Sequence, residues 1–487
     1  MRLCELLKSL DTFRPAVPIR DVPVKGLTAY SKDVRPGFVF VALKGSQADG
    51  SDFIRDALKR GAGVIISESK APVFLKNEKA QFIRIKNGRT AVGLLARAFF
   101  GNPSKKIKIT GITGTNGKTT ISYLIEALLK KNGNIPGVIG TVNYRFKNTV
   151  IVSHNTTPGP VELQAMLKRM ADEGVDHVSM EVSSHALDQQ RTVGIDFSSR
   201  IFTNLTQDHL DYHGTLENYF QAKVKLFHNT CPGASAIINN DDPYGRRLRT
   251  LSSSRVFTYG IEHKSDFMAK DISMDLRGTE FIFVFPRKEI RIKTKLIGRH
   301  NVYNVLAAAA WAYREGVDIE IIRSVFALFP NVPGRMEHIE TRRDFHVFVD
   351  YAHTEDALRN VISTIRQICK NRIIVVFGCG GDRDKSKRPK MGRVVSSLAD
   401  FAVVTNDNPR SESPRGIIRD IIKGISKKNF CVIPDRFEAI EKALYLAAPG
   451  DVVLVAGKGH ENYQIIKDQM IYFDDREVVR ECLKLMN

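Results

Sequence analysis

The segment GITGTNGKTT, residues 111–120, decides the fold because it stands between a predicted strand and a predicted helix. Isoleucines alternate as in a strand between residues 107 and 112, and apolar residues recur at helical spacing from 121 to 129. Glycines let backbone N–H groups turn toward a phosphate, and the helix N-terminus adds partial positive charge. The pattern therefore predicts an ATP-binding loop in which Lys118 reaches the terminal phosphates and Thr119 binds magnesium.

On both sides of this loop, short Val- and Ile-rich runs alternate with helix-length segments, as in parallel α/β sheets. Breaks rich in proline, glycine or charge occur at residues 101–106 and 329–334. We expect an α/β fold of three domains. Residues 1–104 would form a small N-terminal α/β domain, 105–331 a central P-loop-type parallel-sheet ATPase domain, and 332–487 a C-terminal Rossmann-like domain.

The chain has 73 Lys and Arg against 53 Asp and Glu, a net charge of +20, but no aromatic array accompanies the basic residues. We therefore favour a solvated basic surface over a nucleic-acid groove. The six cysteines form no close pair, which indicates reduced thiols and a cytoplasmic setting. The apolar run 305–313 is too short to span a bilayer, so it predicts a buried helix and no membrane insertion.

The string GTNGKTT at 114–120 resembles the ATP loop of the Mur ligases, a family that includes folylpolyglutamate synthetase. Six further strings resemble the members that add the third residue of the peptidoglycan stem. They are MEVSSH (180–185), TNLTQDHLDYHG (203–214), DYAH (350–353), GCGGDRDKSKR (378–388), DNPR (407–410) and GKGHE (457–461).

This resemblance implies a monomeric, cytoplasmic ligase with ATP and Mg²⁺ as cofactors. Its partners would be UDP-N-acetylmuramoyl-L-alanyl-D-glutamate and meso-2,6-diaminopimelate, with no nucleic acid. Chemistry supports an activated intermediate, because a carboxylate does not react with an amine at pH 7 until it gains a leaving group. The γ-phosphoryl group of ATP supplies one by forming an acyl phosphate.

The resemblance also implies which residues do this chemistry. Lys118, His209 and Lys223 would be catalytic, with Lys223 carbamylated by CO₂. The magnesium ligands would be Thr119, Glu181, His209 and Lys223. The nucleotide contacts would be Gly114, Thr115, Asn116, Gly117, Lys118, Thr119, Thr120, Asn301, Arg335 and Asp350.

Residue types alone leave some of these roles open. Glu181 and His209 are expected at strand ends, where ligands of open α/β sheets bind, but they could equally be a helix-starting acid and a surface histidine. For Lys223, an ordinary exposed helix lysine is the more frequent case.

For the nucleotide-sugar substrate, the resemblance implies a uridine diphosphate site in the first domain and a sugar-peptide site in the second. The uridine residues are Ala29, Ser31, Ser46, Gln47 and Ala48, although Tyr30-Ser31-Lys32 departs from a frequent Asp-Ser-Arg form. The sugar-peptide residues are Asn155, Thr156, Thr157, Ser183, Gln189 and Arg191.

The amino acid to be added is expected in the third domain. The resemblance of DNPR to diaminopimelate-adding members has a physical reason, because the Arg410 guanidinium can bind the distal carboxylate in a bidentate fork. The expected contacts are Arg383, Asp407, Asn408, Pro409, Arg410, Gly457 and Glu461.

Three alternatives remain open at this point. A lysine-adding or folylpolyglutamate ligase would share the fold, a basic P-loop ATPase would hydrolyse ATP in response to nucleic acid, and a nucleotide-sugar sensor would bind without forming ADP.

Overall fold

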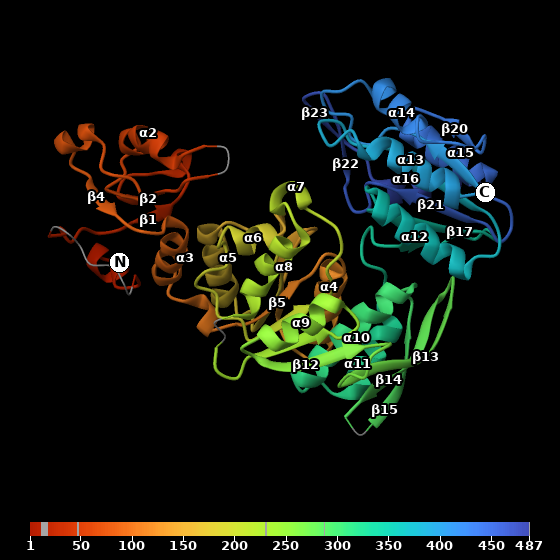
Figure 1. Ribbon diagram of the computed structural model, residues 1–487, viewed down its shortest axis with the longest axis horizontal. Coiled ribbons are helices and arrows are strands. Elements are labelled where there is room, and N and C mark those ends of the chain that lie inside the picture. Colours follow the sequence, from red (N-terminus) through yellow and green to blue (C-terminus); the bar gives the residue numbers. More distant parts are fainter. Residues whose placement is uncertain (11–17, 46–47, 229–230, 287, 487) are drawn as a thin grey trace. The chain divides into compact units, whose positions relative to one another are not determined.

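The computed structural model describes residues 1–487 except 11–17, 46–47, 229–230, 287 and 487 (Figure 1). The chain divides into two compact units. The first comprises Met1–Phe267 and Ala307–Asp318, and the second comprises Met268–Leu306 and Ile319–Asn487.

The first unit begins with a four-stranded parallel sheet in the order β1-β2-β3-β4. Its strands are β1 (Gly26–Thr28), β2 (Phe38–Ala42), β3 (Val64–Ser67) and β4 (Gln81–Arg84), and its helices are α1 (Leu3–Leu7), α2 (Ile54–Lys59) and α3 (Gly88–Phe99). Apolar side chains on the two faces of the sheet form two buried clusters. The predicted small α/β unit is confirmed.

A larger sheet follows in the same unit, with the order β12-β11-β10-β5-β9-β6-β7-β8. These strands are β5 (Lys108–Thr113), β6 (Pro136–Ile139), β7 (Asn143–Phe146), β8 (Thr149–Val152), β9 (His177–Glu181), β10 (Ser199–Phe202), β11 (Ser235–Asn239) and β12 (Arg255–Gly260). The pairings from β12 to β6 are parallel, as the sequence predicts, whereas β6, β7 and β8 pair antiparallel. Because β5 lies between β9 and β10, the ends of all three strands meet at one edge.

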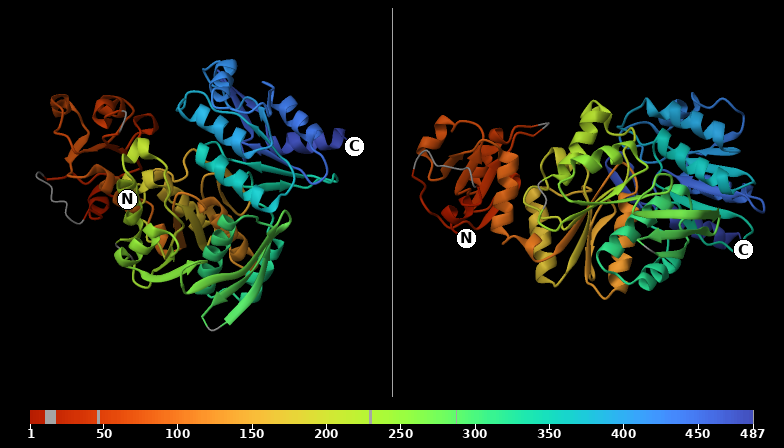
Figure 2. Two further views of the ribbon diagram at one scale, coloured as in Figure 1. Left: turned by 45° about the vertical axis from the view of Figure 1, so that its right-hand side comes forward. Right: turned by 60° about the horizontal axis from the view of Figure 1, so that its bottom comes forward.

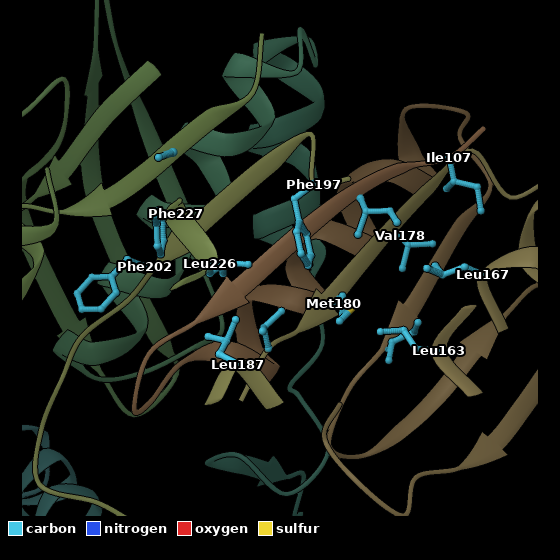
Figure 3. Close-up of a cluster of buried hydrophobic side chains, with 14 of the residues drawn as sticks. Ile107, Leu163, Leu167, Val178, Met180, Leu187, Phe197, Phe202, Leu226 and Phe227 are labelled. Carbon is cyan, nitrogen blue, oxygen red and sulfur yellow. The ribbon is translucent and has the colours of Figure 1, made fainter. Parts of the chain in front are cut away.

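Helices cover this sheet and bury its apolar side chains. They are α4 (Lys118–Lys131), α5 (Pro160–Asp172), α6 (Ser184–Asp188), α7 (Leu210–His213), α8 (Leu216–Val224) and α9 (Pro243–Leu251). Figure 3 shows Val178 and Met180 of β9 beside Leu163 and Leu167 of α5, all within one buried cluster. This packing fixes the strands whose ends carry the candidate site.

The alanine-rich run lies in α10 (Arg299–Arg314), and its residues from Val305 to Ala312 are fully buried, as predicted. Within the first unit, Trp311 Nε1 donates to Thr110 Oγ1 at 3.0 Å and to Ser199 Oγ at 3.1 Å. Among the described residues, no helix is both long and apolar enough to cross a membrane.

The second unit contains an antiparallel set that the sequence analysis did not predict, β13 (Phe267–Asp275), β14 (Gly278–Phe285) and β15 (Lys288–Thr294), with α11 (Ile319–Leu328) packed on β15. A six-stranded sheet follows, in the order β16-β17-β21-β18-β19-β20. Its strands are β16 (Glu337–Ile339), β17 (His346–Asp350), β18 (Ile373–Phe377), β19 (Phe401–Val404), β20 (Phe430–Val432) and β21 (Val452–Ala456), and a separate hairpin is formed by β22 (Tyr463–Ile466) and β23 (Gln469–Tyr472).

All pairings of the six-stranded sheet are parallel except β16 with β17. Its helices are α12 (Glu355–Ile368), α13 (Lys387–Leu398), α14 (Pro414–Ile422), α15 (Arg436–Leu446) and α16 (Asp475–Leu485). One buried cluster joins the sheet to α12, α13 and α14, and a second joins it to α15 and α16. Figure 2 shows helices on both sides of these strands, which confirms the predicted Rossmann-like domain.

Candidate functional site

The predicted phosphate loop connects β5 to α4. Gly117 precedes α4 with a φ of 90°, and Gly114 has a φ of 149°; both are conformations that side chains with a Cβ rarely adopt. The loop is braced by the segment after β10: Thr203 Oγ1 donates to Asn116 O at 2.6 Å, and Asn116 N donates to Asn204 Oδ1 at 3.0 Å. These bonds form a brace that ties the phosphate loop to the segment after β10.

Lys118 is the first residue of α4, and its side chain folds back over the loop. Its Nζ donates to Gly114 O and to Thr115 O, each at 2.9 Å. A cation held above backbone N–H groups at a helix N-terminus suits a bound polyphosphate.

Glu181 ends β9 and lies in register with Ile112 of β5, beside the phosphate loop. Its side chain is 1% exposed and accepts a hydrogen bond from Thr119 Oγ1 at 3.0 Å. Thr141 donates to the same carboxylate from its N at 3.1 Å and its Oγ1 at 3.0 Å. Two of the expected magnesium ligands, Thr119 and Glu181, are therefore in direct contact.

His209 does not lie at a strand end, which corrects the expectation from the sequence. The strand β10 stops at Phe202, and His209 instead precedes α7 with a left-handed φ of 52°. Burial lowers the pKa of the His209 imidazole, and the nearby Lys118 and Lys223 lower it further against the opposing effect of Asp208. The lowered pKa favours the neutral ring, whose nitrogen can offer a lone pair.

Lys223 is buried on α8, so the structure contradicts the alternative of an exposed helix lysine. Its side chain is 1% exposed, and its Nζ lies 4.4 Å from the centroid of the Tyr219 ring. Tyr219 OH is in turn 3.3 Å from Thr115 Oγ1 of the phosphate loop. Burial, with a contribution from Lys118, lowers the pKa of Lys223 well below its ordinary value.

The expected sugar-peptide residues gather behind Glu181. Thr157 Oγ1 donates to Glu181 O at 2.9 Å and accepts from Ser183 N at 3.1 Å. Arg191 Nη1 donates to Thr157 O at 3.0 Å, and Arg191 Nη2 donates to Gln189 Oε1 at 2.7 Å. The structure thus brings these four residues into one hydrogen-bonded group.

The two remaining members of that set lie in the preceding loop. Thr156 Oγ1 is 3.0 Å from Thr141 Oγ1, so it joins the same group through a residue that also binds Glu181. The carbonyl of Asn155 accepts hydrogen bonds from Ser153 Oγ at 3.0 Å and from the Tyr144 hydroxyl.

The expected uridine residues form a separate set. Ala29 follows β1, and Ser31 begins a short 3₁₀ helix, Ser31–Asp33, where its hydroxyl lowers the pKa of the Asp56 carboxyl. Ala48 is exposed, while Ser46 and Gln47 lie outside the described residues. Among the residues that are described, no hydrogen bond links this set to the group around Thr157.

The second unit holds the other expected nucleotide contacts. Asp350 ends β17, and its carboxylate accepts from Met336 N at 2.7 Å and from Ala352 N at 2.8 Å. Burial raises the pKa of Asp350, and Arg335 opposes that rise. Arg335 Nε is buried without a hydrogen-bond partner among the described residues, whereas Asn301 Nδ2 donates to Ile297 O at 2.8 Å.

The expected amino-acid residues converge from the loops that follow β18, β19 and β21. Asn408 Nδ2 donates to Glu461 Oε2 at 3.0 Å, and Arg410 Nη1 donates to Gly381 O at 2.8 Å. Gly457 has a positive φ of 122°, which disfavours a Cβ, and a Cβ there would lie only 2.7 Å from Asp407 Oδ2. Glycine therefore lets this loop approach the carboxylate.

The other two expected residues of this set lie along the same loops. Pro409 O packs so closely on Gly381 that a Cβ there would be 1.9 Å away, and Arg383 is exposed on the loop that follows Gly381. The structure thus brings all seven expected residues to one edge of the sheet.

Lys458 was not singled out from the sequence, although it lies within GKGHE. It is fully buried, donates to Asn408 Oδ1 at 3.3 Å and to Tyr463 O, and lies 3.6 Å from Glu461 Oε2. The GKGHE motif was the only sequence signal for this residue. The sequence did not show that the Lys458 side chain would point into the protein.

Three family models match the chain in succession. They are described as "Mur ligase family, catalytic domain" for residues 23–100, "Mur ligase middle domain" for 112–312 and "Mur ligase, glutamate ligase domain" for 334–459.

Relatives of similar length agree with these matches. The chain is 45% identical over 99% of its length to the UDP-N-acetylmuramoyl-L-alanyl-D-glutamate--2,6-diaminopimelate ligase of Solibacter usitatus, 98% of which is covered. It is also 45% identical to the ligase of that name from Geobacillus kaustophilus, over 93% of this chain and 94% of the relative. A solved structure with the same description superposes with a TM-score of 0.74 at 33% identity, covering 100% of this chain and 99% of the other.

Proposed function

This chain belongs to the Mur ligase family, and we propose that it joins meso-diaminopimelate to UDP-N-acetylmuramoyl-L-alanyl-D-glutamate in an ATP-dependent step of peptidoglycan synthesis. The structural feature that supports this function most directly is the phosphate loop, whose Thr119 contacts the buried Glu181. Relatives that share 45% of their residues with this chain over nearly its full length carry this activity in their names.

The reaction divides into two balanced steps. A carboxylate oxygen of the D-glutamate residue attacks the γ-phosphorus of ATP, and the bond from that phosphorus to the oxygen bridging to the β-phosphate breaks. ADP departs, and the carboxylate becomes an acyl phosphate. The amine of diaminopimelate then attacks the acyl carbon, an amide bond forms, and inorganic phosphate and a proton leave.

In the first step, the proposed role of residues 114–120 is to hold the ATP phosphates. The loop amides and Lys118 stabilise charge on the transferring phosphoryl group, and the brace from Thr203 and Asn204 keeps the loop from relaxing when charge develops. Asn301, Arg335 and Asp350 are proposed as further nucleotide contacts. The unpartnered Arg335 Nε is a donor suited to an anionic group.

The residues beside the loop fit magnesium. Thr119 Oγ1 and the Glu181 carboxylate are hard oxygen donors 3.0 Å apart, and the His209 ring, whose pKa is lowered by burial, would offer a nitrogen donor. The described residues contain no group of three or more His, Cys, Asp or Glu side chains that could hold a metal ion. When bound, Mg²⁺ would neutralise charge on the phosphates.

Lys223 is proposed to carry a carbamate. Its neutral Nζ would attack the carbon of CO₂, one C=O π bond would break, and a proton would leave the nitrogen, so that an anionic metal ligand replaces a neutral amine. Only an unprotonated amine can react in this way. The burial of Lys223 against Tyr219 lowers its pKa and so favours that form.

The nucleotide-sugar substrate is proposed to bind the first unit. Its uridine diphosphate end would contact Ala29, Ser31, Ser46, Gln47 and Ala48, in a domain that we propose to comprise residues 1–104. The sugar and peptide would meet Asn155 and the hydrogen-bonded group of Thr156, Thr157, Ser183, Gln189 and Arg191, whose connection to Glu181 favours delivery of the carboxylate to the phosphate loop.

The amino acid is proposed to bind the C-terminal domain, residues 332–487, with 105–331 as the central domain. Arg410 and Arg383 would bind carboxylates, while Asp407 and Glu461 would receive ammonium groups. Lysine lacks the distal carboxylate, so it would leave Arg410 without a counter-ion in a closed site and should be rejected.

Supplying diaminopimelate, lysine and glutamate separately, with ATP and the UDP-linked dipeptide, tests this specificity. Mass spectrometry should detect a new amide with diaminopimelate, while lysine at equal concentration should react at least about tenfold more slowly. Equal rates would instead support the lysine-adding alternative. Hydrolysis stimulated by DNA or RNA would support the nucleic-acid ATPase. We propose a cytoplasmic setting because ATP and UDP-linked substrates are found there.

A further inference from the structure

A completely buried ion pair lies beneath the proposed amino-acid site. Arg436 begins α15 and Asp475 begins α16, and both side chains are 0% exposed. The pair is bidentate, because Arg436 Nε donates to Asp475 Oδ1 and Nη2 donates to Asp475 Oδ2, each at 2.7 Å. Burying such a pair costs desolvation energy, so stability alone is a weak reason for it.

The remaining donors of Arg436 reach two neighbouring loops. Nη1 donates to Asn406 O at 3.1 Å, and Nη2 donates to Ala456 O at 3.1 Å. Asn406 immediately precedes Asp407, and Ala456 immediately precedes Gly457. One planar guanidinium thus holds the backbone just before two of the residues expected to bind the amino acid.

The sheet order explains why such a connection matters. The strands β19 and β21 do not pair with each other, because β18 lies between them. Beyond their ends, the loops nevertheless approach until a Cβ on Gly457 would be 2.7 Å from Asp407 Oδ2 and 3.9 Å from Arg436 Nη2. The guanidinium is therefore a fixed spacer and a positive charge close to the Asp407 carboxylate.

We propose that Arg436 is a positioning residue for the amino-acid substrate, an inference that rests on the function proposed above. By binding the carbonyls of Asn406 and Ala456 together, it sets the separation between Asp407 and Gly457, while the Asp475 carboxylate balances the buried charge of the guanidinium. Arg436 does not touch the substrate in this account; it acts through the two loops.

A double substitution separates this role from a purely structural one. Changing Arg436→Met together with Asp475→Leu replaces the buried pair with apolar side chains of similar size, which proteins often tolerate. The folded double variant should show a KM for diaminopimelate raised at least about tenfold, while the KM values for ATP and the UDP-linked dipeptide stay within about twofold of the parent.

A control is the pair Arg372–Asp451, 2.6 Å apart, in which Asp451 is buried and Arg372 is half-exposed. It joins the starts of β18 and β21, at the opposite end of the strands from the proposed site. Arg372→Met should lower thermal stability without changing the KM for diaminopimelate. If both variants raised that KM equally, the effect would reflect general loosening of the domain, and the positioning role would be wrong.

Asp475→Asn provides a second test that does not depend on the double variant folding. The amide removes one charge but leaves Arg436 able to hold both carbonyls, so stability should fall while the KM for diaminopimelate stays within about threefold. A folded double variant with unchanged KM, or a large KM change in Asp475→Asn alone, would overturn the inference. If the parent itself formed no amide with diaminopimelate, the proposed function would be the part that failed.

Discussion

Arg410 is the residue on which the proposed choice of amino acid depends. It has a left-handed φ of 50°, and its backbone N donates to Ile465 O at 3.0 Å, so the β22–β23 hairpin fixes the direction in which its side chain leaves. A guanidinium that is already oriented loses little conformational entropy on binding a carboxylate.

Arg410→Lys should raise the KM for diaminopimelate roughly ten- to hundredfold, because a lysine cannot replace two parallel charge-assisted hydrogen bonds. The KM for ATP should be unchanged, as measured by steady-state kinetics with each substrate varied in turn. Arg415→Lys, an exposed substitution nearby on α14, serves as the control. A comparable rise in the KM for ATP would show that Arg410 has been misassigned.

Lys223 offers a second prediction at this scale. Lys223→Ala should lower kcat about hundredfold, because the charge stabilisation of metal ions is worth several kcal/mol, and acetate or formate should restore part of the activity by occupying the place of the carbamate. Gln221→Ala, on the exposed side of the same helix, should have little effect. Full activity of the Lys223 variant would exclude the carbamate.

His177 makes stability depend on pH. Its Nε2 is 3.0 Å from Thr110 Oγ1, its side chain is 3% exposed, and burial lowers its pKa from 6.5 to about 4. Between pH 6.5 and 4 the unfolded chain therefore binds more protons at this residue than the folded chain. The contribution of neutral His177 to the free energy of unfolding is complete above pH 6.5 and is lost as the pH falls toward 4.

Urea unfolding at pH 7 and pH 5 tests this effect. His177 should account for about 2 kcal/mol of the stability lost between the two values, so His177→Gln should show a smaller pH dependence than the parent. The exposed His154→Gln should keep the parental dependence. Parallel curves for parent and His177 variant would contradict this assignment.

At the scale of elements, the phosphate loop and the segment after β10 act as one structure. A Cβ on Gly114 would lie 1.8 Å from Thr203 Oγ1, in a backbone conformation that already disfavours alanine. Gly114→Ala should therefore weaken ATP binding at least about tenfold, since strained backbone costs of order 1–3 kcal/mol. The equilibrium dissociation constant of a fluorescent ATP analogue, compared between parent and variant, measures this loss of affinity.

The control for that variant is Gly133→Ala at the other end of α4. Gly133 also has a positive φ, of 84°, but nothing lies within 4 Å of the position that a Cβ would take there. Gly133→Ala would therefore introduce backbone strain without a collision like that between a Cβ on Gly114 and Thr203 Oγ1. Equal weakening of ATP binding by both variants would show that the brace is unimportant.

Local sequence patterns predicted individual helices and strands where those patterns were strong. The strand β5 and the helix α4 lie where alternation and helical spacing predicted them. The antiparallel strands β13 to β15 and the position of His209 could not be predicted in the same way. Pairing direction and a left-handed residue before α7 depend on contacts distant in sequence.

Across the whole molecule, motifs identified the candidate residues, but folding determined which of them meet. The contact between Thr119 and Glu181 joins residues from two different strings, and it requires β5 and β9 to be neighbours. Arg436 lies in none of the quoted strings, and a single arginine at a helix start gave no sequence signal. Its importance emerges only because the sheet brings Asn406 and Ala456 within reach of one side chain.

The most direct measurement of the central claim is a complete reaction with the purified protein, ATP, Mg²⁺, the UDP-linked dipeptide and diaminopimelate, followed by mass spectrometry. The product should gain the mass of diaminopimelate less one water, with one ADP and one phosphate released for each amide formed. An unchanged UDP-linked dipeptide, whether or not ATP is consumed, would contradict the assignment.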